Sequence, residues 1–236
     1  MIKIRNSFFY FSLVFAVMLP IQGWAEQDGK NKIESNIALS KLMDGNKRYL
    51  AGQSTCGWTH TPTDAQRREQ LANMQKPFAI ILGCSDSRVP PEIIFDQRLG
   101  DIFVIRVAGN LLDDLVLGSI EYAAKYLAAP TPLIFVLGHE KCGAVMAAVQ
   151  AKESGVRFNN NISSIVNKLS SVILKTKKIP GQDFVDDVII NNIKTIVSQL
   201  KSSSPILKEA VSNNDLMIVG GRYDLDTGKV TLIEKG

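Results

Sequence analysis

Short apolar runs and longer segments of helical periodicity alternate along this chain. Five short runs predict strands: residues 77–83, 102–107, 133–137, 216–220 and 229–233. The run at 77–83 has no polar alternation, which is typical of a parallel strand covered on both faces. A turn at 226–228 precedes the last run and predicts a hairpin.

The segments between these runs have apolar positions at helical spacing. They predict helices at residues 36–50, 65–74, 112–127, 141–153, 159–175, 183–200 and 205–212. Because strands and helices alternate, we expect one α/β domain with a mostly parallel central sheet flanked by helices. Residues 36–75 would form an N-terminal helical arm and residues 76–236 the α/β core. Helix 36–50 has no evident place in that core, so we expect it to contact another subunit.

Residues 1–25 have the pattern of a secretory signal peptide. A basic start is followed by an uncharged apolar stretch at 8–19, and small residues precede a cleavage position after Ala25. The stretch is shorter than the roughly 20 residues that span a bilayer. We therefore expect cleavage, a mobile leader at 26–35, a periplasmic or secreted chain and no stable membrane insertion. A retained anchor and a cytosolic chain are the alternatives.

The charge balance is close to neutral. The formal net charge is +4, and Lys3 and Arg5 in the expected signal peptide supply two of those charges, which leaves 4 − 2 = +2. A hydrophobic content of 45% and a charged content of 21% are ordinary for a globular domain. This composition predicts neither nucleic-acid binding nor attraction to an anionic membrane.

Candidate metal ligands follow two of the predicted strands. Cys84 follows the run at 77–83, His139 follows the run at 133–137, and Cys142 lies three residues after His139. Sites in parallel sheets form beyond the carboxyl ends of the strands, so Cys84 and His139 are expected at the same edge. Two thiolates and one imidazole suit zinc and leave a fourth tetrahedral position open, as in catalytic zinc sites. Beside Cys84, the carboxylate of Asp86 and the guanidinium of Arg88 can pair.

Together these motifs resemble those of the β-class carbonic anhydrases. The pattern is Cys84-x-Asp86-x-Arg88 followed by His139-x-x-Cys142. The segments at residues 80–90, 103–110 and 138–144 agree with it, and the resemblance runs from about residue 36 to about residue 234. It implies zinc-dependent, reversible hydration of carbon dioxide to bicarbonate and a proton, by attack of zinc-bound hydroxide.

The resemblance also implies roles for the individual side chains. Cys84, His139 and Cys142 would hold one zinc ion per subunit. Asp86 would orient the hydroxide, and Arg88 would keep Asp86 ionised. In some family members the aspartate instead binds the metal at low pH, and we expect the open form here.

Three further residues are candidates for contact with carbon dioxide or bicarbonate. Gly109 and Gly143 offer backbone without side chains, and Gln97 lies near the position of a substrate-contacting glutamine in some relatives. The family also implies a homodimer or a dimer of dimers, in which helix 36–50 embraces the partner.

Two side chains leave alternatives open. Cys56 can be a buried thiol, an exposed thiol that pairs between chains, or a fourth ligand that would close the site and make it structural or redox-sensing. His60 is the only histidine besides His139 and is the one spare imidazole for a proton shuttle. A related hydrolase that acts on another small heterocumulene, such as carbon disulfide, would use the same ligands.

Overall fold

The structure, a computed structural model, describes residues 35–55, 62–127 and 130–234. Five strands form one sheet in the order β2-β1-β3-β4-β5. They are β1 (Ala79–Gly83), β2 (Ile102–Arg106), β3 (Leu133–His139), β4 (Met217–Tyr223) and β5 (Val230–Glu234). Strands β1 to β4 pair in parallel and β5 pairs antiparallel to β4. The predicted α/β class with a mostly parallel sheet is confirmed.

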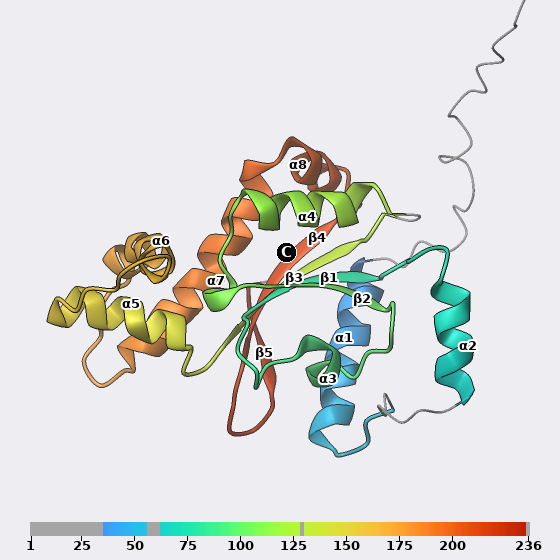
Figure 1. Ribbon diagram of the computed structural model, residues 1–236, viewed down its shortest axis with the longest axis horizontal. Helices are drawn as coiled ribbons and strands as arrows, with labels where there is room; N and C mark the ends of the chain where they lie inside the picture. Colours follow the sequence, from blue (N-terminus) through green and yellow to red (C-terminus); the bar gives the residue numbers. More distant parts are fainter. Residues whose placement is uncertain (1–34, 56–61, 128–129, 235–236) are drawn as a thin grey trace, which may run out of the picture. The chain divides into compact units, whose positions relative to one another are not determined.

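Helices cover both faces of this sheet (Figure 1). They are α1 (Ser35–Leu50), α2 (Pro62–Leu71), α3 (Pro91–Ile94), α4 (Asp114–Lys125), α5 (Gly143–Ser154), α6 (Ile162–Lys175), α7 (Phe184–Ser203) and α8 (Pro205–Ser212), with a 3-10 turn η1 at Ala108–Asn110. Figure 1 shows α4, α7 and α8 on one side of the sheet and α1 and α3 on the other. Every residue of β1 and β3 is buried, as the continuous apolar runs predicted.

The predicted boundaries differ from the structure at two places that matter for the site. Strand β3 runs on to His139, so this histidine is the last residue of the strand and does not follow it. Helix α5 begins at Gly143, two residues after the predicted start, because Lys141 has a positive φ of 51° and Cys142 is the extended N-cap residue. A chain in the left-handed region has left the helical path, so the helix begins only after the turn.

Helix α1 packs against its own chain, which corrects the premise that it has no place in the core. Its buried residues are Ala38, Leu42, Gly45 and Asn46. The Asn46 side chain donates to the carbonyl oxygens of Ile94 at 3.1 Å and Gly228 at 2.9 Å, and accepts from the Val230 amide at 2.9 Å. A polar side chain with all three of these bonds made can be buried without loss of stability, and it fixes where the helix lies. The partner contact expected of this helix stays a prediction.

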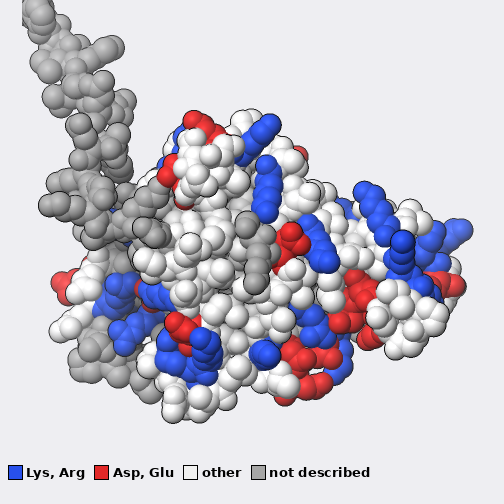
Figure 2. All heavy atoms as spheres, turned by 180° about the vertical axis from the view of Figure 1, so that it is seen from behind, with Lys and Arg blue, Asp and Glu red and all other residues white. Residues whose placement is uncertain are grey.

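The expected signal peptide and residues 26–34 of the expected leader lie outside the described residues; Ser35, expected to end the leader, instead begins α1, and its hydroxyl donates to the Pro132 carbonyl at 2.9 Å. Among the described helices, none has both the length and the apolar character to cross a membrane. Figure 2 shows Lys and Arg side chains interspersed with Asp and Glu side chains over one face of the molecule. This face therefore carries no extended field of a single sign, in line with the near-neutral composition.

Two helical glycines provide a test of how tightly α1 is seated. A Cβ at Gly45 would overlap the carbonyl of Phe95, whereas a Cβ at the exposed Gly118 of α4 would meet nothing within 4 Å. Alanine is favoured over glycine in a helix by about 1 kcal/mol. We expect Gly118→Ala to gain up to that amount and Gly45→Ala to lose about 1–3 kcal/mol through overpacking. Chemical unfolding of both variants measures the difference. If the two variants were equally stable, the Gly45 position of α1 would not be in close contact with the Phe95 carbonyl.

Candidate metal centre

The structure brings the three predicted ligands together in the interior. Cys84 follows the end of β1, His139 ends β3, and Cys142 caps α5. Their ligand atoms all lie within 4.8 Å of one another, and all three residues are buried. The strand order explains this, because β1 and β3 are neighbours while the chain between them passes through β2 on the other side. Such a reversal of strand order opens a crevice at the carboxyl ends of the two strands.

The turn between His139 and Cys142 returns the chain to the same place within four residues. The positive φ of Lys141 reverses the backbone, and the Cys142 sulfur then lies at the N-terminus of α5. The amides of Val145 and Ala144 favour the charged form of that thiol, although burial and the nearby Cys84 raise its pKa overall. One short turn therefore supplies two ligands.

His139 carries the observation that most directly indicates a metal. Its Nδ1 lies 2.8 Å from the carbonyl oxygen of Glu140, and a carbonyl only accepts, so Nδ1 carries the proton. Its Nε2 is then an acceptor, and it is buried with no hydrogen-bond partner among the described residues. An unsatisfied buried acceptor costs about 1–3 kcal/mol. A metal ion bound by Nε2 and the two sulfurs would remove that cost, so the residues present fit a cation such as zinc.

Without a cation, the two neighbouring cysteine sulfurs cannot readily both be ionised. The hydrogen bond between the two cysteines lowers the pKa of Cys84, helped by the Gly109 amide, which donates to the Cys84 sulfur at 3.3 Å. The same interaction raises the pKa of Cys142. The pair therefore holds one negative charge, because two buried thiolates repel each other. A divalent cation between them favours both thiolates.

Asp86 and Arg88 form a two-pronged ion pair beside the ligands. Arg88 Nε lies 3.0 Å from Asp86 Oδ1, and Arg88 Nη2 lies 2.7 Å from Oδ2. The Arg88 side chain holds the pKa of Asp86 well below its usual value, so Asp86 is ionised at neutral pH. Asp86 Oδ2 also lies 3.9 Å from His139 Nε2, which places the carboxylate next to the ligand cluster. The open form of the site stays a prediction.

Arg106, at the end of β2, is a site residue that the sequence reasoning did not single out. Its guanidinium donates to the carbonyl oxygens of Cys84 at 2.8 Å and Asp86 at 2.5 Å. It therefore holds the backbone between the first ligand and the carboxylate. The available signal was an arginine at the carboxyl end of a strand that borders β1.

The three predicted substrate contacts lie in different surroundings. Gly109 has a φ of 73°, which suits glycine, and its amide bonds directly to the Cys84 sulfur. Gly143 follows Cys142, and a Cβ there would meet nothing within 4 Å. Gln97 is buried and donates to the Phe95 carbonyl at 2.5 Å, close to Gly45. Gly109 and Gly143 are therefore at the cluster, whereas Gln97 is bound within the turn after α3. Cys56 and His60 lie outside the described residues.

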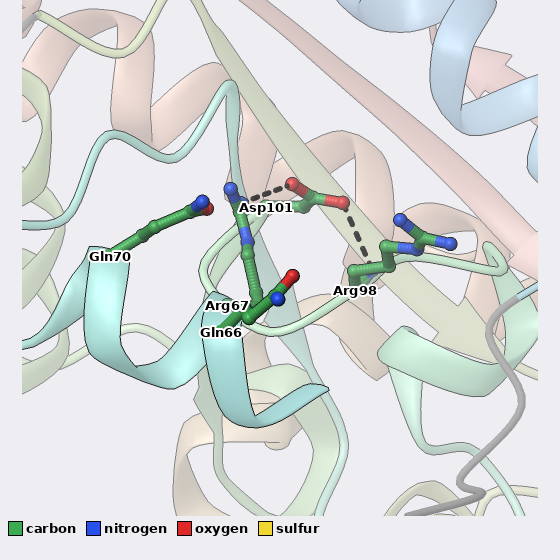
Figure 3. Close-up of a pocket in the computed structure, with 5 residues that line it drawn as sticks. All are labelled: Gln66, Arg67, Gln70, Arg98 and Asp101. Atoms are coloured by element: carbon green, nitrogen blue, oxygen red, sulfur yellow. Dashed lines mark hydrogen bonds and ion pairs between the residues drawn. The ribbon is translucent and has the colours of Figure 1, made fainter. Parts of the chain in front are cut away.

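A separate polar cavity of about 350 Å³ lies between α2 and the loop before β2. It is lined by Gln66, Arg67, Gln70, Arg98 and Asp101 (Figure 3). Arg67 is already paired with Asp101 at 3.0 Å, and none of the five residues is a cysteine or histidine. The metal-binding chemistry therefore lies in the cluster at β1 and β3, away from this cavity.

Comparison with known proteins identifies the class. A family model described as carbonic anhydrase matches residues 79–230. The carbonic anhydrase of Mycolicibacterium smegmatis is 40% identical over 195 residues, which is 83% of this chain and 91% of that protein. Carbonic anhydrase 2 of Mycobacterium tuberculosis has the same identity and coverage.

Solved structures agree with this class. The β-carbonic anhydrase CcaA has a TM-score of 0.63 at 25% identity and covers 82% of this chain and 94% of its own. A Coccomyxa β-carbonic anhydrase, solved in complex with acetazolamide, has a TM-score of 0.62 at 26% identity and covers 82% and 85%. This chain belongs to the β-class carbonic anhydrase family and is a carbonic anhydrase.

Proposed function

We propose that the chain hydrates carbon dioxide reversibly to bicarbonate and a proton, with one zinc ion held by Cys84, His139 and Cys142. The observation that carries the proposal is the buried Nε2 of His139, which has no hydrogen-bond partner among the described residues and lies beside two cysteine sulfurs. Zinc held by these three residues would lower the pKa of a water molecule and so supply hydroxide near neutral pH. That the chain is a carbonic anhydrase follows from its family. The use of zinc and the identity of its three ligands are what we propose.

The chain's own residues then orient the attacking oxygen. The Asp86 carboxylate faces the cluster and is ionised, so it can accept a hydrogen bond and fix the direction of the oxygen lone pair. Arg88 holds Asp86 through both carboxylate oxygens, and Arg106 holds the backbone beneath it. Gly143 leaves space beside the cluster for a small apolar substrate, because a Cβ there would meet nothing within 4 Å, whereas Gly109 is closely surrounded and contributes its amide to the Cys84 sulfur. Gln97 stays a prediction as a substrate contact.

Metal and activity should depend together on the three ligands. We expect Cys84→Ala, His139→Ala and Cys142→Ala each to lose zinc and carbon dioxide hydration, because each removes one of only three protein ligands. Metal analysis and stopped-flow hydration, with and without a chelator, measure both properties. Cys56→Ser is the control and should keep both. A ligand variant with full zinc and full turnover would exclude that residue, and zinc loss in Cys56→Ser would indicate a closed, four-ligand site.

Asp86 and Arg88 should affect turnover without affecting the metal. Asp86→Asn removes the charge that orients the attacking oxygen, and loss of one such group costs about 10²-fold in kcat. Arg88→Ala should also slow turnover, and the double variant should cost less than the sum because both changes break one pair. Asp44→Asn, which removes an exposed partner of Lys47 on α1, is the matched control. Zinc loss in Asp86→Asn would instead identify Asp86 as a metal ligand.

The pH profile separates this role from metal binding by Asp86. Because the Arg88 guanidinium lowers the pKa of Asp86, its carboxylate is already ionised where activity rises and does not titrate there. Turnover should rise from pH 6 to pH 9 in wild type and in Asp86→Asn, at a lower plateau in the variant. If the decline at low pH disappears in the variant, Asp86 binds the metal there.

Assembly into a dimer or a dimer of dimers is part of the proposal. Two β-carbonic anhydrases of Sordaria macrospora, described as tetrameric, share this fold at a TM-score of 0.63 and 22% identity. On α1, Ile37 and Leu50 remain 57% and 43% exposed although the helix packs on its own core, which leaves apolar surface for a partner. Light scattering of the active enzyme tests this, and a fully active monomer would refute it.

Export is also proposed, from the signal pattern of residues 1–25. Cleavage after Ala25 would place the enzyme in the periplasm or outside the cell. Mass spectrometry of the purified, exported chain would give its first residue. A mature chain that begins at Met1 would overturn the proposal.

A further inference from the structure

Glu140 lies between two of the ligands and holds one of them through its backbone. Its carbonyl oxygen accepts the Nδ1 proton of His139 at 2.8 Å. The direction of this carbonyl therefore decides which imidazole nitrogen is free and where it points. A metal-binding histidine is usually fixed by such a bond from its other nitrogen.

The carboxylate of Glu140 is itself anchored from several sides. Oε2 accepts from the Leu225 amide at 3.2 Å, while Oε1 lies 3.5 Å from Lys141 Nζ and 3.9 Å from Arg222 Nη2. Its side chain is only 19% exposed. The Glu140 amide also donates to the Tyr223 carbonyl at 2.9 Å. Residue Glu140, whose carbonyl accepts the His139 proton, is thus held through both its amide and its side chain.

The partners of Glu140 are held in turn by the β4–β5 hairpin and by α7. Arg222 Nε lies 2.6 Å from Asp186 at the start of α7, and Arg222 Nη1 lies 3.5 Å from Asp224. Lys141 Nζ lies 3.0 Å from Asp226 in the hairpin turn. The exposed pair of Lys141 and Asp226 adds little to stability. The partly buried contacts of Arg222 with Glu140 and Asp186 hold the turn between His139 and Cys142 in one geometry.

We propose that Glu140 is a positioning residue for His139: its anchored carboxylate fixes the carbonyl that keeps the proton on Nδ1 and aims Nε2 at the metal. The proposal rests on the proposed function only in that the cluster holds zinc. It adds a role for the β4–β5 hairpin, which would hold the metal ligand His139 in place through Glu140. The motif His139-x-x-Cys142 does not by itself indicate this role.

The test compares zinc affinity and the state of the His139 ring in the full chain. We expect Glu140→Ala to weaken zinc binding about 10-fold or more, as loss of a group that supports a metal ligand does, measured by competition with a chelator. The chain has only two histidines, so ring-nitrogen NMR of the zinc-loaded protein can resolve His139. The proton on Nδ1 should exchange with solvent faster in Glu140→Ala than in wild type.

Two further variants sharpen the test. Glu153→Ala removes an exposed glutamate of α5 that pairs with Lys178, at 2.7 Å, and should leave zinc affinity and the ring signals unchanged. Glu140→Gln keeps an oxygen for the Leu225 amide but loses the charge that faces Lys141 and Arg222, and should lie between wild type and Glu140→Ala. If Glu140→Ala does not fold, Glu140→Gln carries the test by the same two measurements.

The outcomes separate positioning from a merely structural role. Weaker zinc binding with faster Nδ1 proton exchange, at nearly unchanged thermal stability of the metal-free chain, supports the proposal. Unchanged zinc affinity and ring signals, or lower stability of the metal-free chain with unchanged ring signals, overturn it. The proposed function fails separately, if the zinc-loaded wild type does not hydrate carbon dioxide. In that case the effect of Glu140 on zinc and on the ring would still decide the positioning role.

Discussion

The pairing of β1 with β3 is the constraint on which the rest of the site depends. Gly83 lies opposite Leu137 in this parallel pair, so Cys84 follows level with Gly138 and beside His139. A slip of one residue would turn every side chain of one strand to the other face of the sheet. Because both strands are buried on both faces, such a slip would leave exposure unchanged, but it would bring Leu137 or His139 to the closely packed place of Gly138, where a Cβ would meet Ile193 at 2.6 Å. The hydrophobic core therefore sets the position of the ligands before any metal is bound.

The candidate metal centre brings together groups that are costly to bury elsewhere in this core. Two cysteine sulfurs lie in the interior beside an imidazole nitrogen that has no hydrogen-bond partner in the described part of the chain. Each is costly to bury in isolation, and a divalent cation satisfies all three. Around them the charges lie nearer the surface: the Arg88 side chain is 53% exposed, and Asp86 is 17% exposed. The site thus has a buried half that suits the metal and an outer half that can meet water and substrate.

The β4–β5 hairpin joins parts of the chain that lie far apart in sequence. Asn46 of α1 bonds to Gly228 and Val230 at this hairpin, and on the other side Glu140 and Lys141 bond to Leu225 and Asp226. Helix α1 and the turn that carries two ligands therefore share one support. Helix α1 is therefore part of its own subunit's fold. Only the apolar side chains that stay exposed on it are available for contact with a partner.

The sequence by itself determined the class of fold, most of the elements and the set of residues that meet at the metal centre. Short continuous apolar runs are typical of parallel strands covered on both faces, and the motif Cys84-x-Asp86-x-Arg88 with His139-x-x-Cys142 predicted a shared site at their ends. Each of these patterns lies within one short segment, so it can be recognised from the sequence without knowing which distant segments that segment contacts. The tertiary structure decided what depends on contacts between distant segments: the burial of α1 through Gly45 and Asn46, the support of Arg106, and the clamp on Glu140. Side chains that act by bonding to a backbone carbonyl or amide elsewhere in the chain leave no periodic or spaced pattern, because their partners are defined only when the sheet and its hairpin have formed.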